Sequence, residues 1–496
     1  MLATAPATLT RGEAVRFLQR ATFGGSPDEV QGVIDEGVDR WWRREVAEIP
    51  NSTNSGLFGR DGVRAPTIWN RYFTGNALLR KRMGYALSQI FVTSYAGIDG
   101  HAVFEYIDLL EENCFGTYRE LLDVVSTSVA MGQYLTYTYN FKADWVPGQL
   151  PDENYAREIL QLFSIGLVEL NQNGTLRRDS AGNPIETYDQ DDIIGLARVF
   201  TGWYPNTAIP LPERMRRPMT VNPQWHSPEA KSFLGTTIPA NTGPVTSMKR
   251  ALDTIAAHSN VAPFISRQLI QRLVTSNPSA EYVRRVAAVF NNDGAGVRGN
   301  LEAVFWAILT DDEAWAPPTE TAGKLREPVL RFTSVMRAMG VRSTREPWLL
   351  WSTIDPADGL GHGPFEADSV FNFYRPRYTP PNSGLANRGL VAPEFQLATE
   401  TSVLGWVNFV ARFLQWPPDG IEFDYTGLLV LSSRPAGLVK ELAARMLGWP
   451  LSPETEETIV NAVSAINLWT DEVTQFERIH GAVVMIAASN DFLYER

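Results

Sequence analysis

Three segments of the sequence carry acids, bases and amides in otherwise apolar or irregular contexts. The first, DENYAREILQLFSIG at 152–166, places Asn154 and Glu158 on one face of an expected helix whose other residues are largely apolar. A carboxylate that such a helix buries needs a partner, or it shifts its pKa and becomes neutral. Arg157, Lys231 or a bound cation could serve as the partner of Glu158.

Two further segments hold residues suited to proton transfer. YDQDDIIGLARVFTGW contributes Asp192 and Arg198, and the irregular segment QWHSPEAKSFLG contributes His226 and Lys231. A carboxylate, an imidazole and an amine in one pocket could pass protons to and from a substrate. We therefore predict that Glu158, Asp192, His226 and Lys231 converge as catalytic residues, with Asn154, Arg157, Arg198 and Trp225 as binding residues.

The same acids and the histidine could also hold a metal ion. Glu158, Asp192 and His226 offer oxygen and nitrogen ligands that together suit a divalent cation. No other histidine stands at metal-ligand spacing from His226, so such a site requires three distant segments to fold together. The single cysteine, Cys114, excludes an intramolecular disulfide and any site with several thiolate ligands. The sequence leaves the cofactor unknown, with a divalent metal as the candidate.

Composition and familiar motifs exclude several classes of protein. The formal net charge of -12 and the pI near 5.1 argue against nucleic acid as a partner, because phosphate binding needs a basic face. The sequence has no Walker loop, Rossmann glycine fingerprint, HExxH motif, nucleophile elbow or kinase motif set. No run approaches the roughly 18 apolar residues of a transmembrane helix. The first ten residues, MLATAPATLT, lack a basic region and an apolar core, so we expect no signal peptide in this chain.

Helix signals dominate the chain. Thr10 and Glu13 have the spacing of a capping box. Amphipathic periodicity predicts helices at 67–95, 102–113, 117–135, 153–168, 190–202, 247–257, 261–275, 279–291, 299–310, 325–339, 394–415, 435–446, 453–466 and 470–488. The clearest exception is 168–188, where Asn-Gly and Gly-Asn-Pro turns predict a small β-hairpin. The predicted fold is therefore mainly α-helical.

Two irregular Pro-rich stretches, 204–246 and 342–393, interrupt the helices. Both are too long for simple connections, and segments of this kind commonly cover a site. We expect them to wrap the helical core. No strong linker divides the chain, so we predict one large multi-helix domain at 1–415 and a C-terminal helical portion, 416–496, packed on the same core.

Several segments resemble the successive signatures of the domain of unknown function 1800 family. They read FLQRATFG, DENYAREILQLFSIGL, YDQDDIIGLARVFTGW, HSPEAKSFLG, KLREPVLRFTSVMRAMG, SVFNFYRPRYTPP and GLVAPEFQLATETSV, and together they cover roughly residues 11–415. The family pattern falls on Asn154, Arg157, Glu158, Asp192, Arg198, Trp203, His226 and Lys231, which adds Trp203 to the binding residues. The chain departs from the pattern where Gln161 replaces an acid and where Ser227 follows His226 in place of an aspartate.

The resemblance also carries expectations about the setting of the protein. Members of this family are typically exported from bacteria and are often encoded beside members of the domain of unknown function 1501 family. The resemblance therefore implies a periplasmic or extracellular location. It also implies a protein of the domain of unknown function 1501 family as a partner. No settled activity of the family can be transferred to this chain.

Two functions remain open from the sequence. The first is an exported enzyme with a carboxylate, histidine and lysine pocket, with or without a metal, that acts by hydrolysis, elimination or oxidation on an extracellular substrate. The second is a non-catalytic scaffold or a cell-surface assembly or binding protein. In the second case the same residues form a buried ion-pair network, since each charged group named above can satisfy another.

Overall fold

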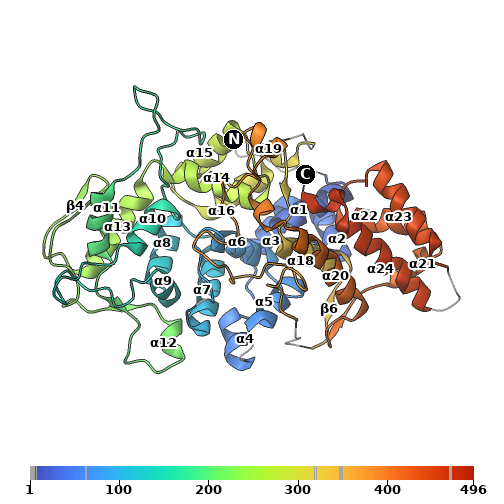
Figure 1. Ribbon diagram of the computed structural model, residues 1–496, viewed down its shortest axis with the longest axis horizontal. Coiled ribbons are helices and arrows are strands. Elements are labelled where there is room, and N and C mark those ends of the chain that lie inside the picture. Colours follow the sequence, from blue (N-terminus) through green and yellow to red (C-terminus); the bar gives the residue numbers. More distant parts are fainter. Residues whose placement is uncertain are drawn as a thin grey trace.

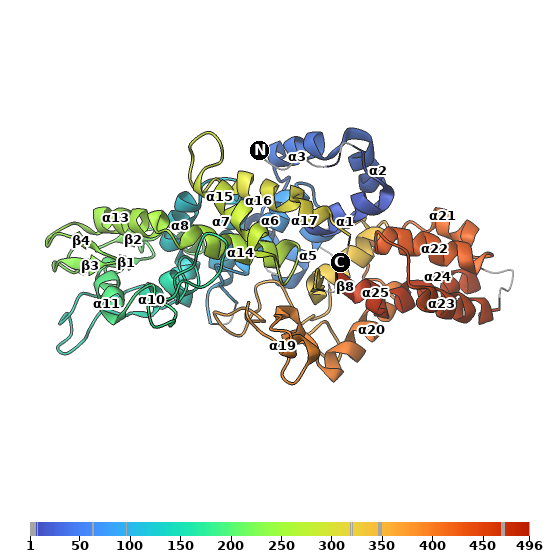
Figure 2. The same cartoon turned by 90° about the horizontal axis from the view of Figure 1, so that it is seen from above.

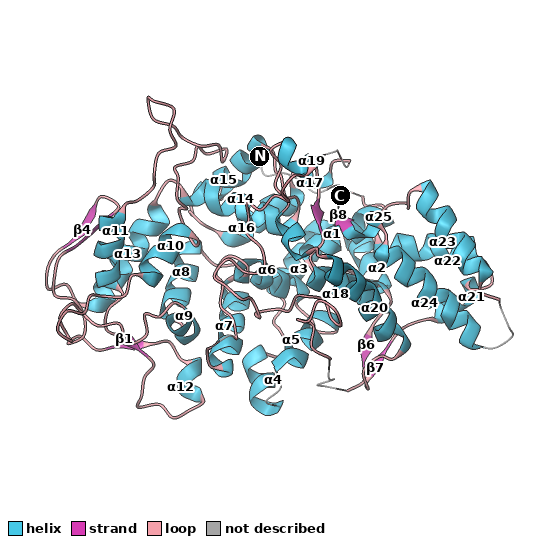
Figure 3. Cartoon of the chain, in the orientation of Figure 1, coloured by secondary structure: helices cyan, strands magenta, loops and turns pink. Residues whose placement is uncertain are grey.

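The computed structural model describes residue 6 and residues 8–61, 64–95, 97–317, 319, 321–345, 350–467 and 472–495. Within this part of the chain helices predominate, as Figure 3 shows. The strands are two or three residues long. The prediction of a mainly α-helical fold is confirmed.

The helices of the described residues follow one another along the chain. In the first half they are α1 (Arg11–Ala21), α2 (Pro27–Glu36), α3 (Val38–Ala47), α4 (Asn54–Asp61), α5 (Arg64–Phe73), α6 (Leu78–Ser88), α7 (Gly100–Asn113), α8 (Tyr118–Thr127), α9 (Val129–Tyr134), α10 (Asn154–Gln161), α11 (Gln190–Val199), α12 (Glu213–Arg216) and α13 (Pro244–Ala257). In the second half they are α14 (Val261–Leu273), α15 (Ala280–Asn291), α16 (Leu301–Thr310), α17 (Asp312–Trp315), α18 (Pro328–Ala338), α19 (Gly384–Asn387), the 3-10 helix η1 (Pro393–Leu397), α20 (Glu400–Gln415), α21 (Thr426–Leu431), α22 (Pro435–Met446), α23 (Pro453–Ala465), α24 (Glu472–Ala488) and α25 (Asn490–Leu493). The predicted capping box at Thr10 and Glu13 is present and begins α1.

The strands pair into small antiparallel sheets. They are β1 (Trp203–Tyr204) with β2 (Thr220–Val221), β3 (Lys231–Phe233) with β4 (Thr236–Ile238), β5 (Lys324–Leu325) with β8 (Tyr494–Glu495), and β6 (Arg342–Ser343) with β7 (Ile421–Glu422). These sheets were not predicted from the sequence. At 168–188, where a small hairpin was predicted, the chain folds back on itself and pairs through isolated antiparallel bridges, among them Leu170 with Leu176.

The molecule is elongated. In Figure 1, α10, α11 and α13 lie at one end, α1, α6 and α18 lie in the middle, and α21, α22, α23 and α24 lie at the other end. Figure 2, turned by 90°, shows the same order along the long axis. Helices α22 and α24 contact each other and also α18, so the segment after 416 packs on the helices of the middle. No helix in the described ranges is both long and apolar enough to cross a membrane.

Helix α10 is shorter than the predicted 153–168 helix. After Gln161 the chain turns back, and the backbone N–H groups of Ile165 and Gly166 both donate to the carbonyl of Leu160. Gly166 has a φ of 68°, a conformation that costs glycine little. This turn directs residues 166–170 along α14. There these residues help to form a cavity.

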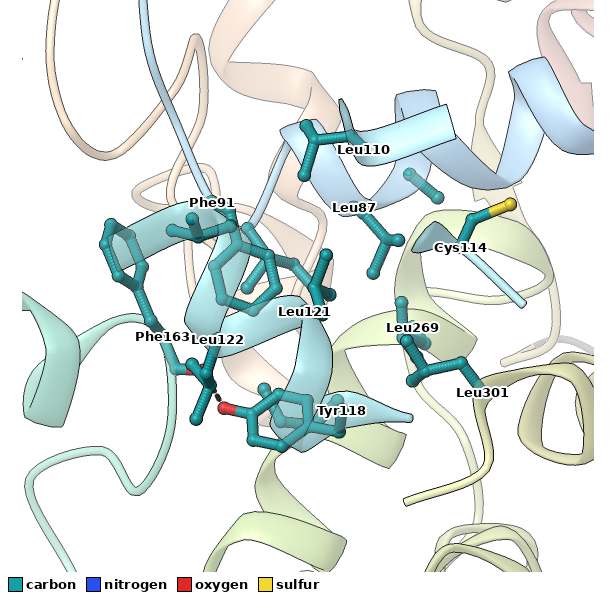
Figure 4. Packing of buried hydrophobic residues seen from close by; sticks show 14 of the residues in the cluster. Leu87, Phe91, Leu110, Cys114, Tyr118, Leu121, Leu122, Phe163, Leu269 and Leu301 are labelled. Atoms are coloured by element: carbon teal, nitrogen blue, oxygen red, sulfur yellow. Dashed lines mark hydrogen bonds between the residues drawn. The ribbon is translucent and has the colours of Figure 1, made fainter. Parts of the chain in front are cut away.

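Buried apolar side chains form two clusters, one mainly around α6 to α16 and one mainly around α5, α18, α20, α22 and α24. Figure 4 shows part of the first, in which Leu87, Phe91, Leu121 and other side chains interlock. Cys114 is fully buried there. The Tyr118 hydroxyl donates to the Phe163 carbonyl at 2.5 Å, so the one polar atom of this ring has a partner.

Distant parts of the chain meet at β8. Lys324 pairs with Glu495 in the β5–β8 sheet, and the carboxylate of Glu495 accepts a hydrogen bond from the Arg20 guanidinium at 3.0 Å. The side chains of Arg20 and Glu495 are 9% and 6% exposed, so this ion pair is largely shielded from water. The ion pair therefore joins α1 to strand β8.

Candidate functional site

Asp192 stabilises the start of α11. Its Oδ2 accepts the backbone N–H of Asp189 in a capping box, and its Oδ1 accepts the backbone N–H of Leu234 at 2.6 Å. Leu234 follows β3, so the carboxylate joins α11 to the β3–β4 turn. Gly195 allows this close packing, because a Cβ atom at that position would lie 1.8 Å from the carbonyl oxygen of Ser232.

Lys231 lies on β3 and is fully buried. Its Nζ donates to the carbonyls of Ser227 and Glu229, at 2.9 and 3.0 Å. Burial and the neighbouring charge of Arg198 lower its pKa. Arg198 in turn makes an ion pair with Glu229 at 2.8 Å. The lysine thus holds the 227–231 turn through backbone carbonyls.

His226 is also buried, at 5% exposure. Its Nδ1 lies 3.0 Å from the carbonyl oxygen of Thr201, and its Nε2 lies 3.4 Å from Oγ of Ser247. Burial lowers the pKa of His226 to about 4, so the imidazole is neutral at pH 7. In this state Nδ1 donates to Thr201 and connects the loop after β2 to the end of α11.

Glu158 is the exception among the predicted catalytic residues. It is 9% exposed, and its Oε2 is buried without a hydrogen-bond partner among the described residues. Burial raises the pKa of Glu158, and the charge of Arg157 opposes that rise. Arg157 itself binds Glu153 at 3.2 Å. Burial of Glu158 was expected to require a partner. No hydrogen bond within the described chain supplies that partner to Oε2.

The remaining candidate binding residues have different surroundings. Asn154 donates its side-chain amide to Thr136 at 3.3 Å. Trp203 is buried on β1, and its indole N–H has no partner among the described residues. Trp225 belongs to a group of five neighbouring rings, here called the aromatic cluster: Tyr139, Phe141, Trp145, Tyr204 and Trp225. Tyr139 and Trp145 are 45% and 43% exposed, so the cluster reaches the surface.

The structure thus gathers Asp192, Arg198, His226 and Lys231 around α11, β3 and the loop before β3. Glu158, on α10, makes no hydrogen bond or ion pair with any of them in the described part of the chain. Among the described residues, no three histidine, cysteine, aspartate or glutamate side chains form a group that could hold a metal ion.

A cavity of about 320 Å³ lies elsewhere, between the ends of α6 and α10, one face of α14 and the segment 370–377. We call it the α14 cavity. Its apolar lining comes from Ile90, Leu162, Leu167, Val168, Leu170, Phe264, Val370, Phe371 and Pro376. Its polar lining comes from Gln89, Gln161, Gln268, Gln271, Arg267, Arg272, Arg375 and Arg377, with no aspartate or glutamate. The segment 370–377 lies within the stretch 342–393 that was expected to cover a site.

Gln89 connects the α14 cavity to a buried carboxylate. Its Nε2 lies 2.7 Å from Oε2 of Glu327 and 3.0 Å from the hydroxyl of Tyr374, which donates to the same Oε2 at 2.6 Å. Burial alone would raise the pKa of Glu327, but nearby charges, of which His362 has the largest effect and Lys324 the next, hold it below its ordinary value. Glu327 and Tyr374 lie in segments that resemble the family signatures, but they were not predicted as site residues.

One sequence signal could have identified this second site. In KLREPVLRF, one glutamate and three cations stand immediately before or within an apolar helix, a context that requires burial of charge. Lys324, Arg326, Glu327 and Arg331 are indeed all buried. The segment alone does not show that Gln89, some 240 positions earlier, contacts Glu327.

Comparison with known proteins gives one match. The family described as "Protein of unknown function (DUF1800)" matches residues 16–494, which extends the resemblance seen in the sequence through the C-terminal helices. Neither curated proteins nor solved structures match the chain. Because the match spans nearly all of α1 to β8, this chain belongs to the DUF1800 family.

Proposed function

We propose that this protein binds a small organic anion in the α14 cavity. The observation that carries the proposal is the composition of the wall, which has four arginines, no acidic residue and a large apolar surface. Guanidinium groups bind carboxylates and phosphates through paired hydrogen bonds, and apolar walls stabilise a hydrocarbon body. The class of ligand is therefore an acid with an apolar portion.

The electrostatics of Arg267 support this proposal. Burial and the nearby charge of Arg377 lower the pKa of the Arg267 guanidinium. Neither arginine has an ion-pair partner in the described part of the chain. A bound anion would offset the free-energy cost of burying the Arg267 charge. It would also offset the repulsion between Arg267 and Arg377.

The proposal can be extended to the acid–base enzyme that the sequence suggests. In this version Glu158 is the general base, because its buried Oε2 has no partner and its raised pKa brings it nearer the range used for proton transfer. Glu158 precedes the cavity-lining Gln161 by about one helical turn. The predicted machinery also includes Asp192, His226 and Lys231, and it would act by hydrolysis, elimination or oxidation. The divalent metal expected on Glu158, Asp192 and His226 is left out, because among the described residues these three do not form a group that could hold one.

The family resemblance supports two further parts of the proposal. Export would bring the cavity into contact with extracellular acids. A protein of the domain of unknown function 1501 family would then be a partner in the same compartment.

A non-catalytic role in binding or surface assembly is the second candidate. It is favoured by the internal partners of Asp192, His226 and Lys231, whose polar atoms contact backbone or hydroxyl groups of the protein. The exposed aromatic cluster favours it too, because large exposed rings commonly mark contact surfaces. Loss of partner binding without loss of acid binding in a Trp145→Ser variant would support this role.

Acid binding can be measured by calorimetry with a matched pair of probes. We expect the protein to bind 3-phenylpropanoate and to bind the neutral alcohol 3-phenylpropan-1-ol at least tenfold more weakly, a difference of about 1.4 kcal/mol. Arg267→Gln should weaken binding of the acid by a similar factor.

Arg40, an exposed arginine on α3, supplies the control variant. Arg40→Gln keeps the change in net charge but lies outside the cavity, so it should leave the affinity for 3-phenylpropanoate unchanged. Equal binding of the acid and the alcohol, or equal effects of the two substitutions, would contradict the proposed function.

A further inference from the structure

Three of the four arginines in the wall of the α14 cavity have no partner within the described part of the protein. The side chains of Arg267, Arg375 and Arg377 make no hydrogen bond or ion pair with any residue that the structure describes. Arg375 and Arg377 are exposed and Arg267 is half-buried, so all three side chains keep surface that a ligand can contact.

Arg272, the fourth arginine, is already engaged. It is 2% exposed, its guanidinium lies 4.7 Å from the centre of the Tyr374 ring, and its Nη2 donates to the Gln89 carbonyl at 3.4 Å. Its charge also acts on a carboxylate of the protein, because burial raises the pKa of Glu394 and the charges of Lys324 and Arg272 oppose that rise. Arg272 therefore contributes less to the field that a ligand meets than the other three arginines.

Two of the unpartnered arginines lie close enough to repel each other. Burial lowers the pKa of the Arg267 guanidinium, and the positive charge of Arg377 lowers it further. Arg375 adds a third charge beside the apolar wall, since its guanidinium lies 5.2 Å from the centre of the Phe371 ring. The wall therefore concentrates positive charge that no described residue of the wall offsets.

This positive charge is opposite in sign to the net charge of the chain. The protein has 56 acidic and 44 basic residues, yet none of the described residues that line the cavity is acidic. A cleft lined by charges of one sign focuses the field and attracts ligands of the opposite sign. The attraction grows with the number of charges on the ligand, because each added charge interacts with the same cations.

We propose that the ligand of the α14 cavity is an organic dianion, an acid whose apolar body carries two negative charges. One negative charge offsets one member of the Arg267–Arg377 pair, and a second offsets the other. This assignment rests on the proposed function, in which the arginines bind the acidic part of the ligand and the apolar wall binds its body. Phosphate monoesters and dicarboxylates share this chemistry.

The test compares ligands that have the same hydrocarbon body but different charge, by calorimetry on the full chain. At about pH 7.5, 2-phenylethyl phosphate carries nearly two negative charges, since the second pKa of a phosphate monoester is about 6. Its methyl diester and 3-phenylpropanoate each carry one. The wild-type protein should bind the monoester at least about tenfold more tightly than either, and this advantage should shrink at about pH 5, where the monoester keeps a single charge.

Benzylsuccinate, which is 3-phenylpropanoate with one added carboxymethyl group, distinguishes the two sources of the dianion. A gain in affinity for benzylsuccinate over 3-phenylpropanoate, without a gain for the phosphate monoester over its diester, identifies a dicarboxylate. The reverse result identifies a phosphate monoester. Gains in both pairs mean that the number of charges alone decides, and all three results support the dianion.

Arg377→Gln leaves Arg267 as the single member of the pair. It should reduce the preference for the phosphate monoester over its diester to less than about threefold, while 3-phenylpropanoate loses little affinity. Arg40→Gln makes the same change in net charge outside the cavity, so it should keep the full preference.

Two results would overturn the dianion and leave the anion site standing. In the first, dianions and monoanions bind equally well to the wild type and Arg267→Gln weakens all of them. In the second, Arg377→Gln and Arg40→Gln reduce the preference equally, so that net charge rather than the cavity is the cause. If none of these ligands binds more tightly than 3-phenylpropan-1-ol, the proposed function fails together with this inference.

Discussion

The side-chain amide of Gln89 donates to the carboxylate of Glu327 across 2.7 Å, which joins the residue after the end of α6 to the residue that caps α18. One wall of the α14 cavity thus depends on a contact between segments 238 positions apart in the sequence. The predicted acid–base residues around α11, by contrast, mostly bind backbone atoms of nearby loops.

Glu158→Gln should stabilise the protein at neutral pH. The folded pKa of Glu158 is raised, so the charged carboxylate costs free energy in the native state at pH 7 and this cost disappears as the pH falls through that pKa. The variant should gain on the order of 1 kcal/mol at pH 7 and nothing at about pH 4. Urea unfolding at both pH values measures the difference.

Glu186→Gln, an exposed position on the neighbouring loop, is the control for Glu158→Gln and should change stability by less than about 0.5 kcal/mol at either pH. A large loss of stability in Glu158→Gln at pH 7 would mean that the carboxylate has a structural partner. A gain in stability with loss of turnover would favour the enzyme version of the proposed function.

His226 should make the protein sensitive to acid. Its folded pKa is depressed to about 4 while the unfolded value stays near 6.5, so the unfolded chain takes up the proton first and stability is lost as the pH falls between these values. The loss is up to about 1.4 kcal/mol per pH unit from this residue. His226→Gln should flatten the stability profile between pH 6.5 and 4 by that slope, as followed by urea unfolding. Parallel stability profiles for His226→Gln and wild type would contradict the assignment.

The buried ion pair between α5 and α7 should be costly to break. Arg71 and Glu111 are 2% and 4% exposed at their side chains and make two parallel hydrogen bonds of 3.0 and 2.7 Å. Glu111→Gln removes the carboxylate that makes both hydrogen bonds and leaves Asp108, at 3.6 Å, as the counter-charge of the guanidinium, so it should cost about 3 kcal/mol in urea unfolding. Glu281→Gln, which breaks the exposed pair with Arg284, should cost less than about 1 kcal/mol. Similar losses in the two variants would show that burial does not set the strength of these pairs.

Gly195→Ala should disrupt the packing of α11 on β3. The new Cβ would lie 1.8 Å from the Ser232 carbonyl oxygen, so the strand must move, and we expect a loss of about 3 kcal/mol or more. Gly32→Ala in α2 meets no atom within 4 Å and should stabilise the protein by about 0.5–1 kcal/mol. Thermal unfolding of both variants measures the contrast, and equal effects would rule out close packing at Gly195.

The sequence predicts the helices well because periodicity and capping are local signals. The segment predicted at 435–446 forms α22 with the same bounds, and that at 453–466 forms α23 to within one residue. The four small sheets were missed because strands of two or three residues are too short to show alternation. Two of the sheets also pair strands that lie far apart in the chain, β5 with β8 and β6 with β7.

The candidate site was harder to predict for a different reason. The types of Asp192, His226 and Lys231 suggest chemistry, but their partners are backbone and hydroxyl groups that any sequence could supply. The α14 cavity draws on four separate segments. Their meeting is not encoded in residue type or spacing.

The ion pair between Arg20 and Glu495 has a consequence for biosynthesis. Its partners are 475 positions apart, so at roughly 5–20 residues per second a ribosome needs on the order of half a minute or more to deliver the second after the first. During that interval α1 lacks its contact with the Glu495 carboxylate, and β5 lacks its neighbouring strand. The edge of β5 therefore stays open to pairing with other strands, a feature that favours aggregation.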